Sequence, residues 1–133
     1  MRESRVTGYI ALGANLGDAV ATVRRAMDAI GQLPQTQLTR RSSLYRTAPV
    51  DAAGPDYINA VVEISTALSA PVLLQQLQQL ELDAGRERPY RNAPRTLDLD
   101  LLLYGDAQIQ SPALTLPHPR MAGRAFVLMP LAE

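Results

Sequence analysis

The sequence predicts an α+β fold in which an antiparallel sheet carries its helices on one face. Three observations lead to this prediction. Segments of alternating apolar and polar residues and segments with apolar residues at helical spacing follow one another in the order strand, helix, strand, strand, helix, strand. The chain has no internal repeat, linker or low-complexity tract. Its 133 residues suit one domain, so residues 1–133 are expected to form a single domain with a proper core.

The first half of the chain supplies a strand, a helix and a second strand. Val6 to Leu12 reads as the first strand, and the turn-rich segment from Gly13 to Asp18 closes it. Asp18 is the expected N-cap of a helix that ends near Gly31. Its core-facing residues recur at helical spacing and are Val20, Val23, Met27 and Ile30. A second strand is predicted from Leu38 to Arg46.

A loop over residues 47–56 leads to the third strand, which begins at Tyr57. Alternation there places Tyr57 and Asn59 on one face, directed away from the main core. The opposite face is apolar and carries Ile58, Ala60, Val62 and Ile64. Pro71 lies in the first turn of a second helix, and Gly85 is its stop signal. An arginine-rich loop over residues 86–94 follows.

The run from Leu97 to Leu103 carries two aspartates one residue apart. As a strand it would place Asp98 and Asp100 on one face. The other face is expected to be apolar, with Leu97, Leu99, Leu101 and Leu103. The two aspartate Cα atoms would lie about 7 Å apart, and their carboxylates would repel by roughly 2 kcal/mol at an effective dielectric of about 20. A divalent cation between them would reverse the local field, whereas a half-exposed strand with solvated aspartates is the alternative.

The order of these elements is the split βαβ arrangement of ferredoxin-like folds, which by itself specifies no function. Beyond this last strand come a turn at Gly105 and Asp106, the run from Leu114 to Pro119, and an apolar run over residues 126–131.

The composition limits which catalytic and binding chemistry the chain can use. All 13 basic residues are arginine, cysteine is absent, and His118 is the only histidine. The chain therefore has no P-loop lysine, Schiff base, thiolate nucleophile or disulfide. Aspartate oxygens suit a hard cation such as Mg²⁺ or Mn²⁺. The arginines that precede them suit phosphate oxygens, which a guanidinium binds in a bidentate fork.

Net charge is zero, so nothing indicates bulk attraction to nucleic acid or membrane. No apolar run approaches the length of about 20 residues that a membrane span needs, and the first residues lead into a strand rather than a signal peptide. We expect a monomer in the cytoplasm that binds small molecules and neither nucleic acid nor membrane.

Several separated segments resemble the 6-hydroxymethyl-7,8-dihydropterin pyrophosphokinase family, and together they cover nearly the whole chain. The most specific is Pro94-Arg95-Thr96-Leu97-Asp98-Leu99-Asp100, whereas the glycine-rich segment over residues 9–17 alone would be weak. The others are Ser43-Leu44-Tyr45-Arg46-Thr47-Ala48-Pro49, Pro55-Asp56-Tyr57-Ile58-Asn59-Ala60, Glu81 with Gly85-Arg86, and Leu116-Pro117-His118-Pro119.

The resemblance implies transfer of pyrophosphate from ATP to the hydroxymethyl group of the pterin, with release of AMP, in folate biosynthesis. It implies that Asp98 and Asp100 hold two Mg²⁺ ions and that Arg86 and Arg95 are catalytic. The implied ATP contacts are Gln78, Glu81, Arg88, Thr115, His118 and Arg124. The implied pterin contacts are Thr47, Pro49, Val50, Tyr57, Asn59 and Phe126. Stacking on aromatic rings and an amide edge suit a flat, neutral pterin.

The sequence also departs from the family pattern. Asn92 stands where a tryptophan is common, with Tyr90 as a candidate substitute, Pro119 replaces an aromatic residue, and Ala14 replaces a serine. Members usually continue beyond Glu133, so the chain is either a compact member or one that lacks a short C-terminal segment.

Two other functions stay open on the residues alone: another Mg²⁺-dependent phosphoryl or nucleotidyl transferase, and a binding module for RNA or a metabolite. Single residues also have structural interpretations, with Phe126 in the core, His118 on the surface, Asn59 at a bulge and Glu81 paired with Arg88. The absence of net positive charge and of paired sheet aromatics disfavours RNA.

Overall fold

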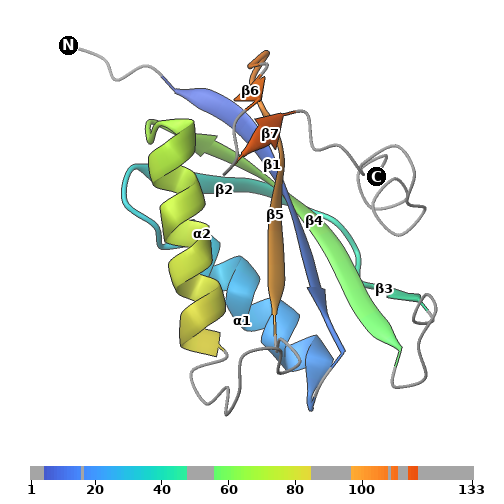
Figure 1. Ribbon diagram of the computed structural model, residues 1–133. Helices are drawn as coiled ribbons and strands as arrows, with labels where there is room; N and C mark the ends of the chain where they lie inside the picture. The colour runs from blue at the N-terminus through green and yellow to red at the C-terminus, as the bar shows by residue number, and fades with distance from the viewer. Residues whose placement is uncertain are drawn as a thin grey trace.

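The computed structural model describes residues 5–15, 17–47, 56–84, 97–107, 109–110 and 114–116. Within these ranges the chain forms two helices packed on a five-stranded sheet, together with a two-stranded pair (Figure 1). The elements in chain order are β1 (Val6–Ala14), α1 (Ala19–Gly31), β2 (Thr36–Arg41), β3 (Tyr45–Thr47), β4 (Tyr57–Thr66), α2 (Ala70–Ala84), β5 (Asp98–Tyr104), β6 (Ile109–Gln110) and β7 (Thr115–Leu116).

The main sheet has the strand order β2-β4-β1-β5, and β3 pairs with β4 beyond the end of β2. Each of these pairings is antiparallel. Strands β1 and β2 therefore run parallel to each other with β4 inserted between them, which is the split arrangement of a ferredoxin-like fold. Both helices lie on the same side of the sheet (Figure 1). The predicted fold class is confirmed.

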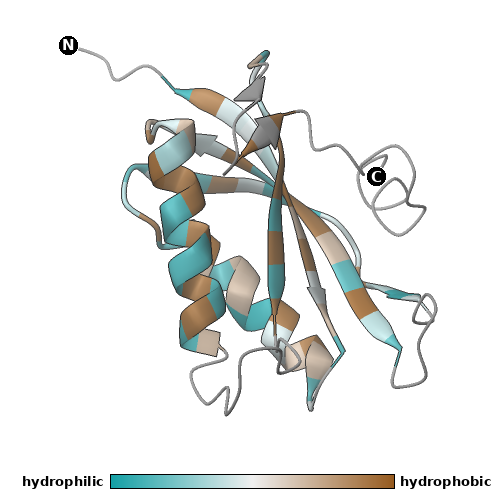
Figure 2. Cartoon of the chain, viewed as in Figure 1, coloured by the Kyte–Doolittle hydropathy of each residue, from teal (hydrophilic) through white to brown (hydrophobic). Residues whose placement is uncertain are grey.

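The two helices form because their sequences place an apolar stripe against the sheet, and the first turn of α1 is also capped. The Asp18 side chain accepts a hydrogen bond from the backbone N–H of Ala21 at 3.1 Å, as the predicted N-cap of α1 should. The buried residues of α1 are Thr22, Val23, Ala26, Met27 and Ile30, and those of α2 are Ala70, Leu73 and Leu77. Hydrophobic and hydrophilic residues are interspersed along both helices (Figure 2), and the buried ones recur at helical spacing, which is the amphipathic pattern of a helix packed on one side.

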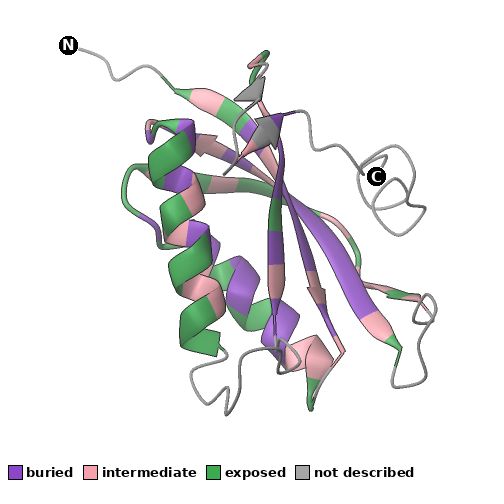
Figure 3. Cartoon of the chain, viewed as in Figure 1, coloured by how far each residue is buried: buried purple, intermediate pink, exposed green. Residues whose placement is uncertain are grey.

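The main core lies between these helices and the inner face of the sheet. Fully buried side chains there include Ile10, Val62, Ile64 and Leu101. Strand β4 is buried along most of its length (Figure 3), because it lies between β1 on one side and β2 and β3 on the other. The alternation predicted for its apolar residues, from Ile58 to Ile64, is confirmed.

Two strand predictions need correction. The single strand expected from Leu38 to Arg46 is divided into β2 and β3; residues 42–44 belong to neither, and the Ser42 side chain accepts the Val61 N–H at 2.9 Å. The first strand does not end at Leu12 but continues through Gly13 to Ala14, where the backbone still pairs with β4.

The expected apolar face of β5 is also wrong at one residue. Leu97, Leu99 and Leu101 lie in the main core, but the register with β1 shifts between Tyr9 and Ile10. The bulge turns Leu103 to the outer face, where it packs on a second apolar cluster, and turns Tyr104 toward the core. That second cluster consists of Ala11, Val61 and Leu102.

Of the helices that the structure describes, neither is long and apolar enough to cross a bilayer.

Candidate active site

The outer face of the sheet, opposite α1 and α2, carries the predicted aspartates. Asp98 lies opposite Gly13 of β1 and Asp100 lies opposite Ala11, so both carboxylates face away from the main core as predicted. Asp98 is half-buried and Asp100 is exposed. Since the two residues are i and i+2 on one strand, their Cα atoms lie about 7 Å apart. The strand thus places two carboxylates on one face of the sheet.

An amide lies in the same cross-strand row as Asp98. Gly13 of β1 pairs with Asp98 on one side and with Asn59 of β4 on the other, so all three positions share the outer face. The Asn59 side chain is 5% exposed, and its Nδ2 donates to Thr47 Oγ1 at 2.7 Å. A Cβ atom at Gly13 would stand 3.3 Å from Asn59 Oδ1. The missing side chain of Gly13 therefore leaves room for the amide, and Thr47 fixes its orientation.

Strand β3 adds Tyr45 and Thr47 to this end of the outer face. Thr47 pairs with Tyr57, and Tyr45 pairs with Asn59. Because paired residues of an antiparallel ladder share a face, Tyr45, Thr47, Tyr57 and Asn59 form one polar and aromatic group on the outer face. The prediction that Tyr57 and Asn59 point together away from the main core is confirmed.

The last turns of α2 approach β5, the strand that carries Asp98 and Asp100 and is called the aspartate strand below. Glu81 is half-buried, and its Oε2 accepts a hydrogen bond from the backbone N–H of Leu99 at 2.9 Å. Leu99 is the residue between Asp98 and Asp100. Gln78, on the same helix, is exposed. The structure therefore joins the predicted Glu81 to the aspartate strand through the backbone.

The donors fit a hard divalent cation. Mg²⁺ retains several waters and is commonly bound by one or two carboxylates together with substrate phosphates, so it needs no larger protein cage. Two aspartates on one face, one of them exposed, meet that requirement. Among the residues that the structure describes, no group of three or more carboxylate, imidazole or thiol side chains is placed to hold a metal ion.

The far end of the outer face carries a hydrogen-bonded carboxylate. Glu63 accepts from Tyr9 Oη at 2.7 Å through Oε2 and from Thr39 Oγ1 at 2.8 Å through Oε1. These two bonds, the one from Tyr9 first, hold the pKa of Glu63 below its ordinary value. The bond to Glu63 raises the pKa of Tyr9. The network ties β1, β4 and β2 together beside the second apolar cluster.

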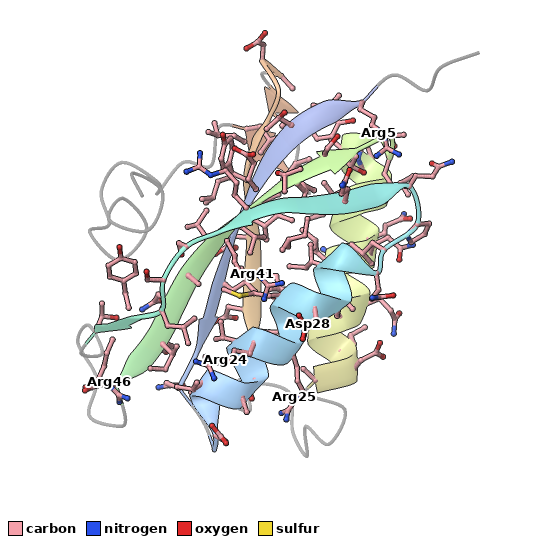
Figure 4. All side chains as sticks on the ribbon, turned by 180° about the vertical axis from the view of Figure 1, so that it is seen from behind. Arg5, Arg24, Arg25, Asp28, Arg41 and Arg46 are labelled. Atoms are coloured by element: carbon pink, nitrogen blue, oxygen red, sulfur yellow. The ribbon has the colours of Figure 1, made fainter. Side chains whose placement is uncertain are left out.

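Several predicted site residues lie outside the described residues: Arg86, Arg88, Arg95, His118, Arg124, Pro49, Val50 and Phe126, with Tyr90, Asn92 and Pro119 among the departures. The backbone of Thr115 lies in β7. Figure 4 shows where some described arginines lie: Arg24 and Arg25 on α1, and Arg46 on β3. Arg41 of β2 pairs with Asp28 of α1 at 3.5 Å, an exposed ion pair of little energetic weight.

Gly13 and Tyr45 were not among the predicted site residues, although the sequence contains a signal for each. Gly13 continues the outward series Tyr9, Ala11, Gly13 once the first strand is extended by two residues. Tyr45 precedes Thr47 by two residues and so shares its face. Both were missed because strand ends and pairing partners depend on neighbours that are distant in sequence.

The fold and this face together define an α+β protein of the ferredoxin-like class whose sheet carries carboxylates, an amide and aromatic rings on its outer face. Residues 9–133 match the family described as 7,8-dihydro-6-hydroxymethylpterin-pyrophosphokinase.

Three relatives carry the name 2-amino-4-hydroxy-6-hydroxymethyldihydropteridine pyrophosphokinase. The protein from Haemophilus influenzae is 48% identical over 96% of this chain and 81% of its own. Those from Pseudomonas aeruginosa and Bacillus subtilis are 44% and 45% identical, over 94% of this chain in each case and 78% and 75% of their own lengths. The chain belongs to this pyrophosphokinase family, and the resemblance inferred from its motifs is confirmed.

Proposed function

We propose that this protein transfers pyrophosphate from ATP to the hydroxymethyl group of 6-hydroxymethyl-7,8-dihydropterin in folate biosynthesis. The hydroxymethyl oxygen attacks the β-phosphorus of ATP and loses its proton, and the bond from that phosphorus to the oxygen bridging the α-phosphorus breaks. The products are AMP and the pterin diphosphate. Membership of the pyrophosphokinase family carries this proposal.

The cross-strand row of Asn59, Gly13 and Asp98 supports the proposal physically. The amide and the carboxylate are separated by two strand spacings, about 10 Å. This span accommodates a flat heterocycle bound at the amide with its substituent directed toward the aspartates. An amide offers one acceptor and two donors for a heterocyclic edge, and here one donor is engaged by Thr47.

In this proposal each group acts mainly by positioning. Thr47 orients the Asn59 amide, which binds the pterin together with Tyr57, Pro49, Val50 and Phe126. Phosphoryl-type transfer requires little covalent work from a protein and depends on alignment and on neutralisation of charge.

The residues that bind the metal and ATP are assigned from the family resemblance. Asp98 and Asp100 hold Mg²⁺, two ions being expected, and the metal when bound neutralises phosphate charge. Arg86 and Arg95 act on charge that develops in transfer. Gln78, Arg88, Thr115, His118 and Arg124 contact ATP. A monomer in the cytoplasm that binds neither nucleic acid nor membrane stays a prediction from the sequence.

The test is to incubate the protein with ATP, Mg²⁺ and the reduced hydroxymethylpterin and to identify the nucleotide product. AMP is expected, whereas ADP would indicate a single phosphoryl transfer and would support the alternative transferase. Asp98→Ala and Asp100→Ala should each remove most turnover and leave the circular dichroism spectrum unchanged, because neither carboxylate faces the main core. Near-full activity of either variant at saturating Mg²⁺ would exclude the metal assignment.

A further inference from the structure

Glu81 contacts the aspartate strand at the one residue that lies between the two carboxylates. Its Oε2 accepts the backbone N–H of Leu99 at 2.9 Å. Strand β5 pairs with β1 on one side and ends the strand order of the main sheet. In an antiparallel pair, every second residue directs its N–H away from the neighbouring strand. Leu99 is such a residue, and Glu81 accepts its N–H on the side of β5 where the described sheet order ends.

The position of Glu81 on α2 is unusual for a charged residue. Leu73 and Leu77 are buried on the face of α2 that meets the sheet, and Glu81 follows them at the same spacing of four residues. A carboxylate that continues an apolar stripe must be compensated by hydrogen bonds. The Leu99 N–H supplies one. Because Leu99 is only 5% exposed, that N–H in turn depends on an acceptor from the protein.

The bond constrains the geometry of the two aspartates. Asp98 and Asp100 are the immediate chain neighbours of Leu99, and their separation and direction follow from the backbone at this residue. Groups that orient metal-binding side chains without contacting the metal typically change metal affinity or activity by about 10-fold to 100-fold when they are removed. A functional site of this kind needs its ligands held to within about 0.5 Å.

We propose that Glu81 is a positioning residue, which holds the Asp98–Asp100 segment in place from α2 through the Leu99 N–H. This inference rests on the proposed function, because it requires the aspartates to bind a cation. It assigns to Glu81 a role different from the ATP contact that the family resemblance implied. Glu81→Gln keeps an oxygen that can accept the N–H but removes the charge, and Glu81→Ala removes the acceptor.

The matched control is Asp83→Asn. Asp83 lies on the same last turns of α2, is exposed and accepts a hydrogen bond from Gln79 Nε2 at 2.9 Å within the helix. This variant removes one negative charge from the helix without changing a group that bonds to β5. It therefore shows how much of any effect comes from the charge of the helix end alone.

Two measurements test the proposal in the full chain. The first is amide hydrogen exchange of Leu99, followed by nuclear magnetic resonance. The second is a titration with Mn²⁺ alone, followed by paramagnetic broadening of the amide signals of residues 98–100. Glu81→Ala is expected to lose the Leu99 protection and to need about tenfold more Mn²⁺ for the same broadening. Glu81→Gln and Asp83→Asn are expected to stay close to the unmodified protein in both measurements, and kcat with Mg²⁺, ATP and the hydroxymethylpterin should fall in Glu81→Ala.

Three results would overturn the proposal. One is unchanged Mn²⁺ broadening in Glu81→Ala. Another is an equal loss of Mn²⁺ broadening in Glu81→Gln and Glu81→Ala while Leu99 stays protected in Glu81→Gln, which would show that charge and not position matters. The third is a rise in KM for ATP alone, with exchange and broadening unchanged, which would make Glu81 a nucleotide contact. Absence of broadening in the unmodified protein would instead reject the metal assignment itself, and the inference with it.

Discussion

The hydrogen bond between Thr47 and Asn59 gives a prediction that separates the orientation of the Asn59 amide from the shape of the side chain at residue 47. Thr47→Val replaces a hydroxyl by a methyl group of similar size, so it removes the acceptor for Asn59 Nδ2, now 2.7 Å away, and leaves the strand propensity of residue 47 nearly unchanged. Asn59 is 5% exposed, so its amide has little access to water in place of the lost partner.

The magnitude follows from burial. A buried donor that loses its acceptor costs about 1–3 kcal/mol. Thr47 is itself half-buried, so we expect the lower end, a fall of about 1 kcal/mol in the free energy of unfolding. A misoriented amide should also raise KM for the pterin by about tenfold, equivalent to about 1.4 kcal/mol. KM for ATP should not change, because Thr47 lies on β3 and does not contact the aspartate strand.

The assay is urea unfolding together with initial rates at varied pterin and saturating ATP. Thr47→Ser is the matched control, because it keeps the hydroxyl and loses only the methyl group. The serine variant should keep the pterin KM of the unmodified protein. Equal pterin KM values for the valine and serine variants would refute the reasoning that the hydroxyl orients the amide.

Three further predictions concern Gly13 and Tyr9 of the same sheet and Arg95. Gly13→Val should raise the pterin KM by about tenfold or more, because its Cβ would stand 3.3 Å from Asn59 Oδ1 and its γ carbons would crowd the amide further; a KM equal to that of the unmodified protein would contradict this. Tyr9→Phe should lower the free energy of unfolding at pH 7 by about 1 kcal/mol. The folded-state pKa of Glu63 lies below its unfolded value, so this difference in the free energy of unfolding should shrink as the pH falls below the ordinary glutamate pKa of about 4.3. A difference that stays constant with pH in urea unfolding would reject this link between Glu63 protonation and stability. Arg95→Ala should lower kcat more than it raises KM for ATP, whereas a rise in KM alone would assign Arg95 to ground-state binding.

The sequence by itself determined the elements whose signal is local. Alternation along residues 57–64 fixed which side chains of β4 face the core, because successive residues of a strand point to opposite faces whatever their neighbours are. The N-cap at Asp18 and the helical spacing that follows it predicted α1 for a similar reason. The sequence also predicted that Asp98 and Asp100 share the outward face of β5, because the two residues are i and i+2 on one strand.

Only the tertiary structure decided features that depend on a partner strand or helix. The bulge opposite Tyr9 and Ile10 moved Leu103 to the outer face, since register is a property of two strands and not of one. Gly13 joined the site because β4 extends far enough to pair with it. Glu81 reached Leu99 because α2 packs beside a strand that has no further neighbour in the described sheet order and so has N–H groups in need of an acceptor.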